Sequence, residues 1–224
     1  MGSTPANGIK SIDDIFLRLV HFVERIIGKD RFLLAGSSCG GALAIGLSQQ
    51  FRSQIDGLLL RVPLIESDNS KRDLDSFQPI ISNPELISQL TPQEKNDLGN
   101  ILIQTPEYLS KLRQKINDTV LPAIQASDFG VLGPIRSDKQ LYKLSAKYQS
   151  NTDKFLAPTL ILCGRQDDDV GYRDSIRLLQ QYPRATFAVL DRETHALPLD
   201  DQGLFKALVL NWINRVNEWI IGKG

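Results

Sequence analysis

A short apolar run followed at once by a glycine-rich turn occupies residues 31–41, which read RFLLAGSSCGG. The run is short for a helix, and the glycine directly after it favours a buried strand. The turn has the frame Gly-x-Ser-x-Gly with Ser38 at its centre, and small and aliphatic residues from Gly40 to about residue 51 predict a helix. This order of strand, turn and helix presents the hydroxyl of Ser38 at the edge of a sheet, where the helix N-terminus favours developing negative charge.

Other interpretations of this turn fit the residues less well. A dinucleotide-binding loop needs Gly-x-Gly-x-x-Gly, and Ser38 stands where its second glycine would be. A phosphate-binding loop needs Gly-Lys-Ser/Thr, which these residues do not supply. Cys39 as a nucleophile would need glycine where Ser37 stands. The remaining alternative is a turn whose glycines only allow close packing of a helix on a strand.

Strand and helix patterns alternate through most of the chain. Apolar runs predict strands at 31–35, 57–62, 158–163 and 186–190. Helical patterns occupy 12–27, where Ser11 is the expected N-cap, and 40–51, 172–181 and 202–221. This alternation predicts an α/β fold, with a mostly parallel sheet covered by helices on both faces. Because such sheets bind ligands at the carboxyl ends of their strands, we expect reactive groups just after each strand.

The segment from 63 to about 156 lacks strand patterns. Three helix starts recur in it, each with a capping residue before a proline, at Asn83-Pro84, Thr91-Pro92 and Thr105-Pro106. A looser patch is expected at 129–134, which reads FGVLGP. We therefore predict three parts, namely a first core part at 1–62, a helical cap at 63–156 and a second core part at 157–224.

An acid and a base follow two of the later predicted strands. Three consecutive aspartates begin at Asp167, and an acid at this place can hold a histidine in its useful tautomer. We prefer Asp167 and keep Asp168 and Asp169 as alternatives, with the two remaining acids solvated or capping the next helix. Of the two histidines, His21 lies on the polar face of the first helix and is expected at the surface. His195 follows a strand end, where a base could reach Ser38.

Together these segments resemble the α/β-hydrolase superfamily with a helical cap. The resemblance rests on residues 36–41, residues 158–167 and the segment of His195, in the order Ser…Asp…His that this fold uses. It implies hydrolysis through an acyl-enzyme, in which Ser38 attacks, His195 shuttles the proton and Asp167 orients it. The backbone N–H of Cys39 would then supply one oxyanion donor.

This chain departs from the family pattern near the nucleophile and the base, and more strongly at its front. The family commonly has His-Ser-x-Gly-Gly at the nucleophile and Gly-His at the base, where this chain has Ser37-Ser38-Cys39 and Thr194-His195. Several family strands normally precede the nucleophile strand, and a loop among them gives the second oxyanion donor. Residues 1–5 resemble an internal Gly-x-Gly-x-Ser/Thr loop of the family, so we expect an N-terminally truncated hydrolase that lacks on the order of 50 residues.

Truncation would have two consequences. The strand at 32–35 would become an exposed apolar edge, through which the chain could associate with itself. The loss of one oxyanion donor costs about 10²–10³ in rate. The first hypothesis is a serine hydrolase acting on a small ester, thioester, amide or C–C substrate. The alternative is a truncated, catalytically weak or inactive homologue that acts as a binding module.

Composition sets the remaining expectations. Lysines plus arginines and aspartates plus glutamates number 26 each, so the formal charge is zero and predicts neither nucleic-acid nor membrane binding. The two cysteines, Cys39 and Cys163, have no disulfide or zinc spacing, and no cluster implies a metal or an organic cofactor. Without a signal-peptide pattern in these residues, we expect a cytoplasmic protein whose partner is a small-molecule substrate.

Overall fold

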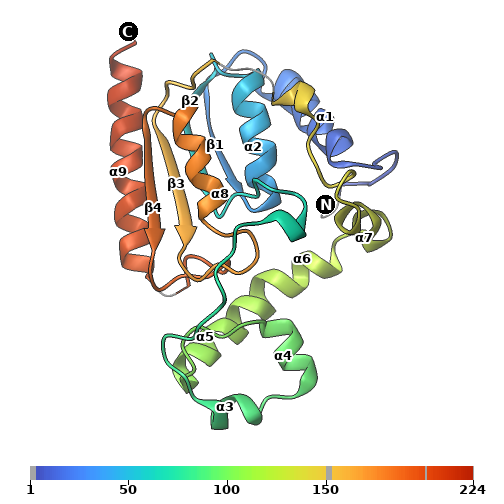
Figure 1. The fold of residues 1–224 in the computed structure, drawn as a ribbon. Helices are drawn as coiled ribbons and strands as arrows, with labels where there is room; N and C mark the ends of the chain where they lie inside the picture. Colours follow the sequence, from blue (N-terminus) through green and yellow to red (C-terminus); the bar gives the residue numbers. More distant parts are fainter. Residues whose placement is uncertain (1–3, 150–152, 200, 224) are drawn as a thin grey trace.

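A four-stranded parallel sheet forms the centre of this computed structural model, which describes residues 4–149, 153–199 and 201–223. The strands are β1 (Phe32–Ser37), β2 (Ile55–Arg61), β3 (Thr159–Gly164) and β4 (Ala185–Leu190), and they lie side by side in chain order (Figure 1). Each neighbouring pair is parallel. The predicted parallel sheet is therefore confirmed, with every predicted strand within two residues of its observed position.

Helices cover both faces of the sheet, as predicted (Figure 1). On one face, α1 (Ile12–Phe22) and α2 (Cys39–Gln50) pack with α8 (Arg173–Ile176) and the 3₁₀ turn Arg177–Gln180. On the other face, α9 (Gln202–Ile221) buries Trp212 and Val216 against Leu160 and Leu162 of β3. Since β3 is buried along its whole length, its continuous apolar run reflects a strand with no face toward water.

The first helix begins and ends as its sequence predicts. The hydroxyl of Ser11 accepts a hydrogen bond from the backbone N–H of Asp14, which satisfies one of the free donors of the first turn. The last turn widens to a π-helix at Val23–Ile27, and Gly28 ends it with a φ of 65°, a conformation that glycine adopts without strain.

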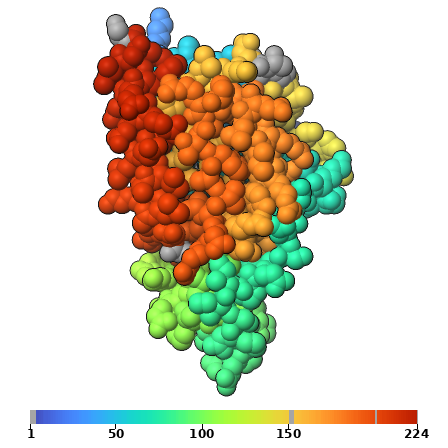
Figure 2. All heavy atoms as spheres, turned by 60° about the vertical axis from the view of Figure 1, so that its left-hand side comes forward, coloured from blue at the N-terminus to red at the C-terminus, as the bar shows by residue number. Residues whose placement is uncertain are grey.

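The chain between β2 and β3 is helical, and part of it forms a lobe beyond the ends of the strands (Figures 1 and 2). It contains α3 (Pro84–Ser88), α4 (Pro92–Leu98), α5 (Pro106–Lys115), the π-helix Ile116–Val120, α6 (Leu121–Gln125) and α7 (Phe129–Ser137). The side chains of Asn83, Thr91 and Thr105 cap α3, α4 and α5, each before a proline. A separate apolar cluster that includes Leu102, Leu109 and Leu112 holds this lobe together. The division at 62/63 and 156/157 stays a prediction.

The prediction of a looser patch at 129–134 is wrong, because these residues form the first two-thirds of α7. The carboxylate of Asp128 accepts the N–H of Val131 and starts the helix. Ile135 is buried in the main core and holds α7 against it, although Pro134 lies inside the helix. Burial of an apolar side chain here outweighs the weak helix propensity of glycine and proline.

Two further expectations concern the front of the chain, namely an exposed apolar edge at the first strand and a family-like loop at residues 1–5. Within the described residues β1 pairs only with β2 and forms an edge, with Leu33 44% exposed. The segment 1–5 lies partly outside the described residues. No helix among the described residues is long and apolar enough to cross a membrane.

Candidate active site

Ser38 lies at a strained turn between β1 and α2. Its φ of 53° and ψ of −123° place a residue with a side chain in a backbone region that favours glycine. The N–H of Ser38 donates to the carbonyl of Arg61 at 3.1 Å, which ties the turn to β2. A Cβ on Gly36 would lie 2.3 Å from the carbonyl oxygen of Gly40, so this glycine is required by the close approach of strand and helix.

Asp167 follows β3 in a loop that fixes its carboxylate. Its Oδ1 accepts the backbone N–H groups of Asp169 and Val170 at 2.9 and 3.0 Å, which leaves Oδ2 for another donor. The residue is buried, and burial raises the pKa of a carboxyl. The hydrogen bonds from His195 and from the two backbone groups outweigh that effect, so the pKa of Asp167 lies below its usual value.

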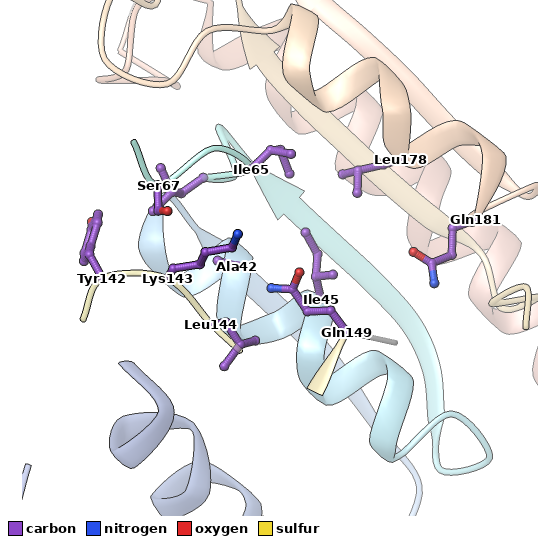
Figure 3. A pocket seen from close by; sticks show the side chains of 11 residues that line it. Ala42, Ile45, Ile65, Ser67, Tyr142, Lys143, Leu144, Gln149, Leu178 and Gln181 are labelled. Carbon is purple, nitrogen blue, oxygen red and sulfur yellow. The ribbon is translucent and has the colours of Figure 1, made fainter. Parts of the chain in front are cut away.

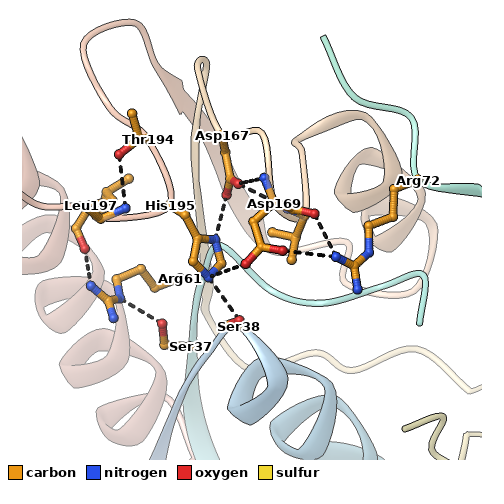
Figure 4. A network of polar contacts seen from close by, with 11 residues as sticks. Ser37, Ser38, Arg61, Arg72, Asp167, Asp169, Thr194, His195 and Leu197 are labelled. Atoms are coloured by element: carbon orange, nitrogen blue, oxygen red, sulfur yellow. Dashed lines mark hydrogen bonds and ion pairs between the residues drawn. The ribbon is translucent and has the colours of Figure 1, made fainter. Parts of the chain in front are cut away.

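His195 follows β4 and joins the other two side chains (Figure 4). Its Nδ1 lies 3.0 Å from Oδ2 of Asp167, and its Nε2 lies 3.0 Å from Oγ of Ser38. An ionised carboxylate can only accept, so Nδ1 carries the proton and Nε2 is left to accept the hydroxyl proton of Ser38. This arrangement can activate a serine as a nucleophile at neutral pH.

The structure thus brings together the three residues selected from sequence, and among the three aspartates Asp167 alone lies on Nδ1. Of the two alternatives for the other aspartates, capping is not observed, because neither accepts a hydrogen bond from the start of α8, while the side chain of Asp169 is 44% exposed. Asp168 accepts a hydrogen bond from Asn100, and Asp169 pairs with Arg72 at 3.1 Å. Both partners come from the segment between β2 and β3, which sequence spacing could not connect to this loop.

The second acid also lies near the base. Oδ2 of Asp169 is 3.7 Å from Nε2 of His195, too far for a hydrogen bond but close enough to attract an imidazolium. Arg72 holds Asp169 through its carboxylate and through its backbone carbonyl at 2.8 Å. The side chain of Arg72 is only 5% exposed.

Cys39 begins α2, so its backbone N–H lies at the helix N-terminus beside the nucleophile. Its role as an oxyanion donor stays a prediction. Burial raises the pKa of the Cys39 thiol, while a hydrogen bond with Tyr142 and the charge of Arg136 act against the rise. A thiol that resists ionisation is a poor nucleophile, which agrees with the choice of Ser38 over Cys39. His21 is exposed, as predicted.

A second set of polar contacts, missed from sequence, joins the nucleophile turn to the loop of the base (Figure 4). Arg61, at the end of β2, donates to Oγ of Ser37 at 3.0 Å and to the carbonyl of Leu197. The negative charge of Glu193 acts on the same guanidinium. In sequence, the signal for Arg61 is a charged residue directly after the apolar run at 58–60.

A polar cavity of about 330 Å³ opens beside the reacting atoms. It is lined by Ser38, Leu64, Asn69, Arg72, Arg136, Tyr142, Asp169, Val170 and His195. A second cavity of about 150 Å³ shares Leu64 and Tyr142 with it and is walled mainly by aliphatic side chains, among them Ile45 and Leu178 (Figure 3). Within the described residues, no group of three or more histidine, cysteine, aspartate or glutamate side chains could hold a metal ion.

The fold and these three side chains define the chain as an α/β-hydrolase. The model of one family, serine aminopeptidase S33, matches residues 3–202, and the chain belongs to this family.

Two kinds of known protein resemble the chain. A proline iminopeptidase from Flavobacterium johnsoniae is 23% identical over 92% of this chain and 73% of its own length. Among solved structures, an α/β superfamily hydrolase from Oenococcus oeni has a TM-score of 0.78 at 22% identity, over 94% of this chain and 76% of its own. A 2-hydroxy-6-oxo-6-phenylhexa-2,4-dienoate hydrolase from Rhodococcus has a TM-score of 0.61 at 17% identity, over 94% of this chain and 74% of its own length. At these identities the solved structures show the fold alone.

Proposed function

We propose that this chain is a serine hydrolase that cleaves a small ester, thioester or amide through an acyl-enzyme on Ser38. The observation that carries the proposal is the pair of 3.0 Å contacts that connect Ser38, His195 and Asp167 in series. The S33 family model and the proline iminopeptidase relative support a hydrolase, and their names are the reason that we include amides in the proposal.

The reaction follows from the contacts. Oγ of Ser38 attacks the substrate carbonyl carbon while its proton passes to Nε2 of His195. The carbonyl oxygen becomes an oxyanion, which the N–H of Cys39 and the N-terminus of α2 stabilise. The tetrahedral intermediate then collapses, and the leaving group departs with the proton from His195. A water molecule repeats these steps on the acyl-enzyme and restores Ser38.

Asp167 and Asp169 have different roles in this scheme. Asp167 keeps His195 in the tautomer with a free Nε2 and stabilises the imidazolium that forms. Asp169 faces the same nitrogen at 3.7 Å, so its charge adds to that stabilisation once Nε2 carries a proton. Arg72 holds Asp169 at this distance through its carboxylate and its backbone carbonyl.

The test is labelling of the purified protein with a fluorophosphonate probe, which reacts with activated serines. We expect labelling of the native chain and none of Ser38→Ala or His195→Ala, with all three proteins folded by circular dichroism. A folded native chain that remains unlabelled would contradict the proposal and favour the alternative of a non-catalytic binding module. Labelling that survives in Ser38→Ala would assign the reactive group elsewhere.

A further inference from the structure

The cavity beside Ser38 is unusually polar for a substrate pocket. Sites for uncharged ligands are lined mainly by apolar and aromatic side chains, with few polar groups. Here only Leu64 and Val170 are aliphatic, and the other lining residues carry hydroxyl, amide, imidazole or charged groups. A substrate with a purely hydrocarbon body would leave those groups without partners, which costs binding energy.

Two of the three fixed charges in the cavity neutralise each other. Arg72 donates to Oδ1 of Asp169 at 3.1 Å and to the carbonyls of Asp169 and Glu66 at 2.8 and 2.9 Å. Its guanidinium is therefore committed to the protein. Because Asp169 is paired with Arg72 and its other oxygen faces His195, it offers little further attraction to a cationic ligand such as an amine.

Arg136 is the third charge, and its guanidinium is uncommitted. Among the residues that the structure describes, none makes a hydrogen bond or ion pair with this side chain. Arg136 also lines a neighbouring pocket formed by residues 67–69 and 136–139. The two carboxylates of that pocket already have other partners. Asp68 pairs with Lys139 at 2.8 Å, and Asp138 accepts the backbone N–H groups of residues 140 and 141. The positive charge of Arg136 thus has no paired counterpart in the part of the chain that the structure describes.

The helix fixes the backbone of Arg136, while the residue itself is exposed to solvent. It lies in the last turn of α7, next to Ile135, which is 3% exposed and belongs to the main core. The charge of Arg136 acts on both the Cys39 thiol, beside the nucleophile, and the hydroxyl of Tyr142. This side chain therefore lies within electrostatic reach of the reacting centre while remaining open to a ligand.

We propose that Arg136 is a specificity-determining residue that binds a carboxylate of the substrate, so that the preferred substrates are small esters or amides carrying a negative charge. A planar guanidinium can hold a carboxylate by two parallel hydrogen bonds, and the partly enclosed cavity strengthens them. This inference rests on the proposed function, since it names the substrate class of the same site.

A binding measurement tests the anion site without turnover. Calorimetric titration of Ser38→Ala with monomethyl glutarate is compared with titration by its neutral amide analogue, methyl glutaramate. We expect the acid to bind about 10- to 100-fold more tightly, as one charge-assisted interaction allows. The double variant Ser38→Ala/Arg136→Gln should lose this difference, whereas Ser38→Ala/Arg25→Gln, which removes an exposed charge of the first helix, should keep it.

A kinetic measurement tests specificity in the active chain. We measure kcat/KM for an acidic ester and for its neutral amide analogue and take the ratio of the two. One substrate pair carries the carboxylate on the acyl half (monomethyl glutarate), and the other carries it on the alcohol half (O-acetylglycolate). In at least one pair the native ratio should exceed 1, fall about 10- to 100-fold in Arg136→Gln, and be partly restored in Arg136→Lys.

The two proposals fail in different ways. A chain that is labelled at Ser38 but shows no preference for the acids, or an unchanged ratio in Arg136→Gln, would overturn the role of Arg136 and leave the hydrolase intact. A chain that is never labelled would overturn the hydrolase, and tight Arg136-dependent binding of monomethyl glutarate would then support the anion site alone.

Discussion

Arg61 connects the turn that carries Ser38 to the loop that carries His195, and its replacement by methionine tests whether that connection holds the site. The guanidinium donates to Oγ of Ser37 and to the carbonyl of Leu197. Methionine occupies a similar volume without donors or charge, so the perturbation is mainly electrostatic.

The expected cost follows from what Arg61 leaves behind. Glu193 is fully buried, and its carboxylate accepts the N–H groups of Leu199 and Asp201 at 3.3 and 3.0 Å. Arg61→Met removes two hydrogen bonds and the attraction between the guanidinium and the charge of Glu193. A buried acceptor left without its partner typically costs about 1–3 kcal/mol, so the two acceptors and the lost attraction together give an expected cost of about 3 kcal/mol. In a chain of 224 residues that corresponds to a fall in Tm of about 6–12 °C.

Thermal and urea unfolding, followed by circular dichroism, measure this cost, with Arg25→Met as a control at an exposed arginine. Arg61→Lys keeps the charge but has fewer hydrogen-bond donors, so it should lose about half as much stability as Arg61→Met. At 20 °C, where the variants remain folded, Arg61→Met should also react more slowly with the fluorophosphonate probe, because the loop of His195 is less well held. An Arg61→Met protein within about 0.5 kcal/mol of the native chain would refute the reasoning, since surface substitutions cost no more.

Three further predictions concern packing, pH and association. Gly36→Ala should destabilise the chain by about 1–3 kcal/mol, because its Cβ would lie 2.3 Å from a backbone oxygen. The control Gly133→Ala, whose Cβ would have no atom within 4 Å, should not destabilise it. Equal unfolding midpoints of the two variants would contradict this prediction. The folded pKa of Asp167 is lowered, so its contribution to stability is complete above the unfolded value of about 3.9 and is lost as the pH falls through the folded value. Unfolding between pH 5 and 2 should therefore depend less on pH in Asp167→Asn, and parallel curves would count against it. Leu33, exposed on the edge strand β1, should promote self-association, so Leu33→Lys should shift sedimentation toward monomer; a native chain that is monomeric at every concentration would exclude this.

The sheet and the three reactive residues could be predicted because both depend on local patterns. Short apolar runs bounded by glycine or proline predict buried strands, and parallel strands place their carboxyl ends at one edge. Ser38, Asp167 and His195 each follow such an end, so their meeting required no knowledge of the packing. The three consecutive aspartates are alike in sequence, and the tertiary structure decides between them by turning the carboxylate of Asp167 toward His195.

The helical segment between β2 and β3 could be predicted only in its helix starts. Capping residues before prolines are local signals, and all three begin helices. The segment 129–134 became helical because Ile135 is buried in the core, a contact that its own residues do not specify. The partners of Asp168 and Asp169, which are Asn100 and Arg72, are likewise set by how this segment folds over the loop.

By itself the sequence determined the order of strands and helices, the tight turn at Ser38 and the residue types that follow the strands, because each of these depends on neighbours within a few positions. Only the tertiary structure decided which charges are paired and which remain open to a ligand. Arg61, Arg72 and Arg136 are alike in sequence, yet the first joins two loops of the core, the second is committed to Asp169, and the third faces the cavity uncommitted. Their difference arises from long-range packing, which brings carboxylates and carbonyls far apart in the chain to two of the three guanidinium groups.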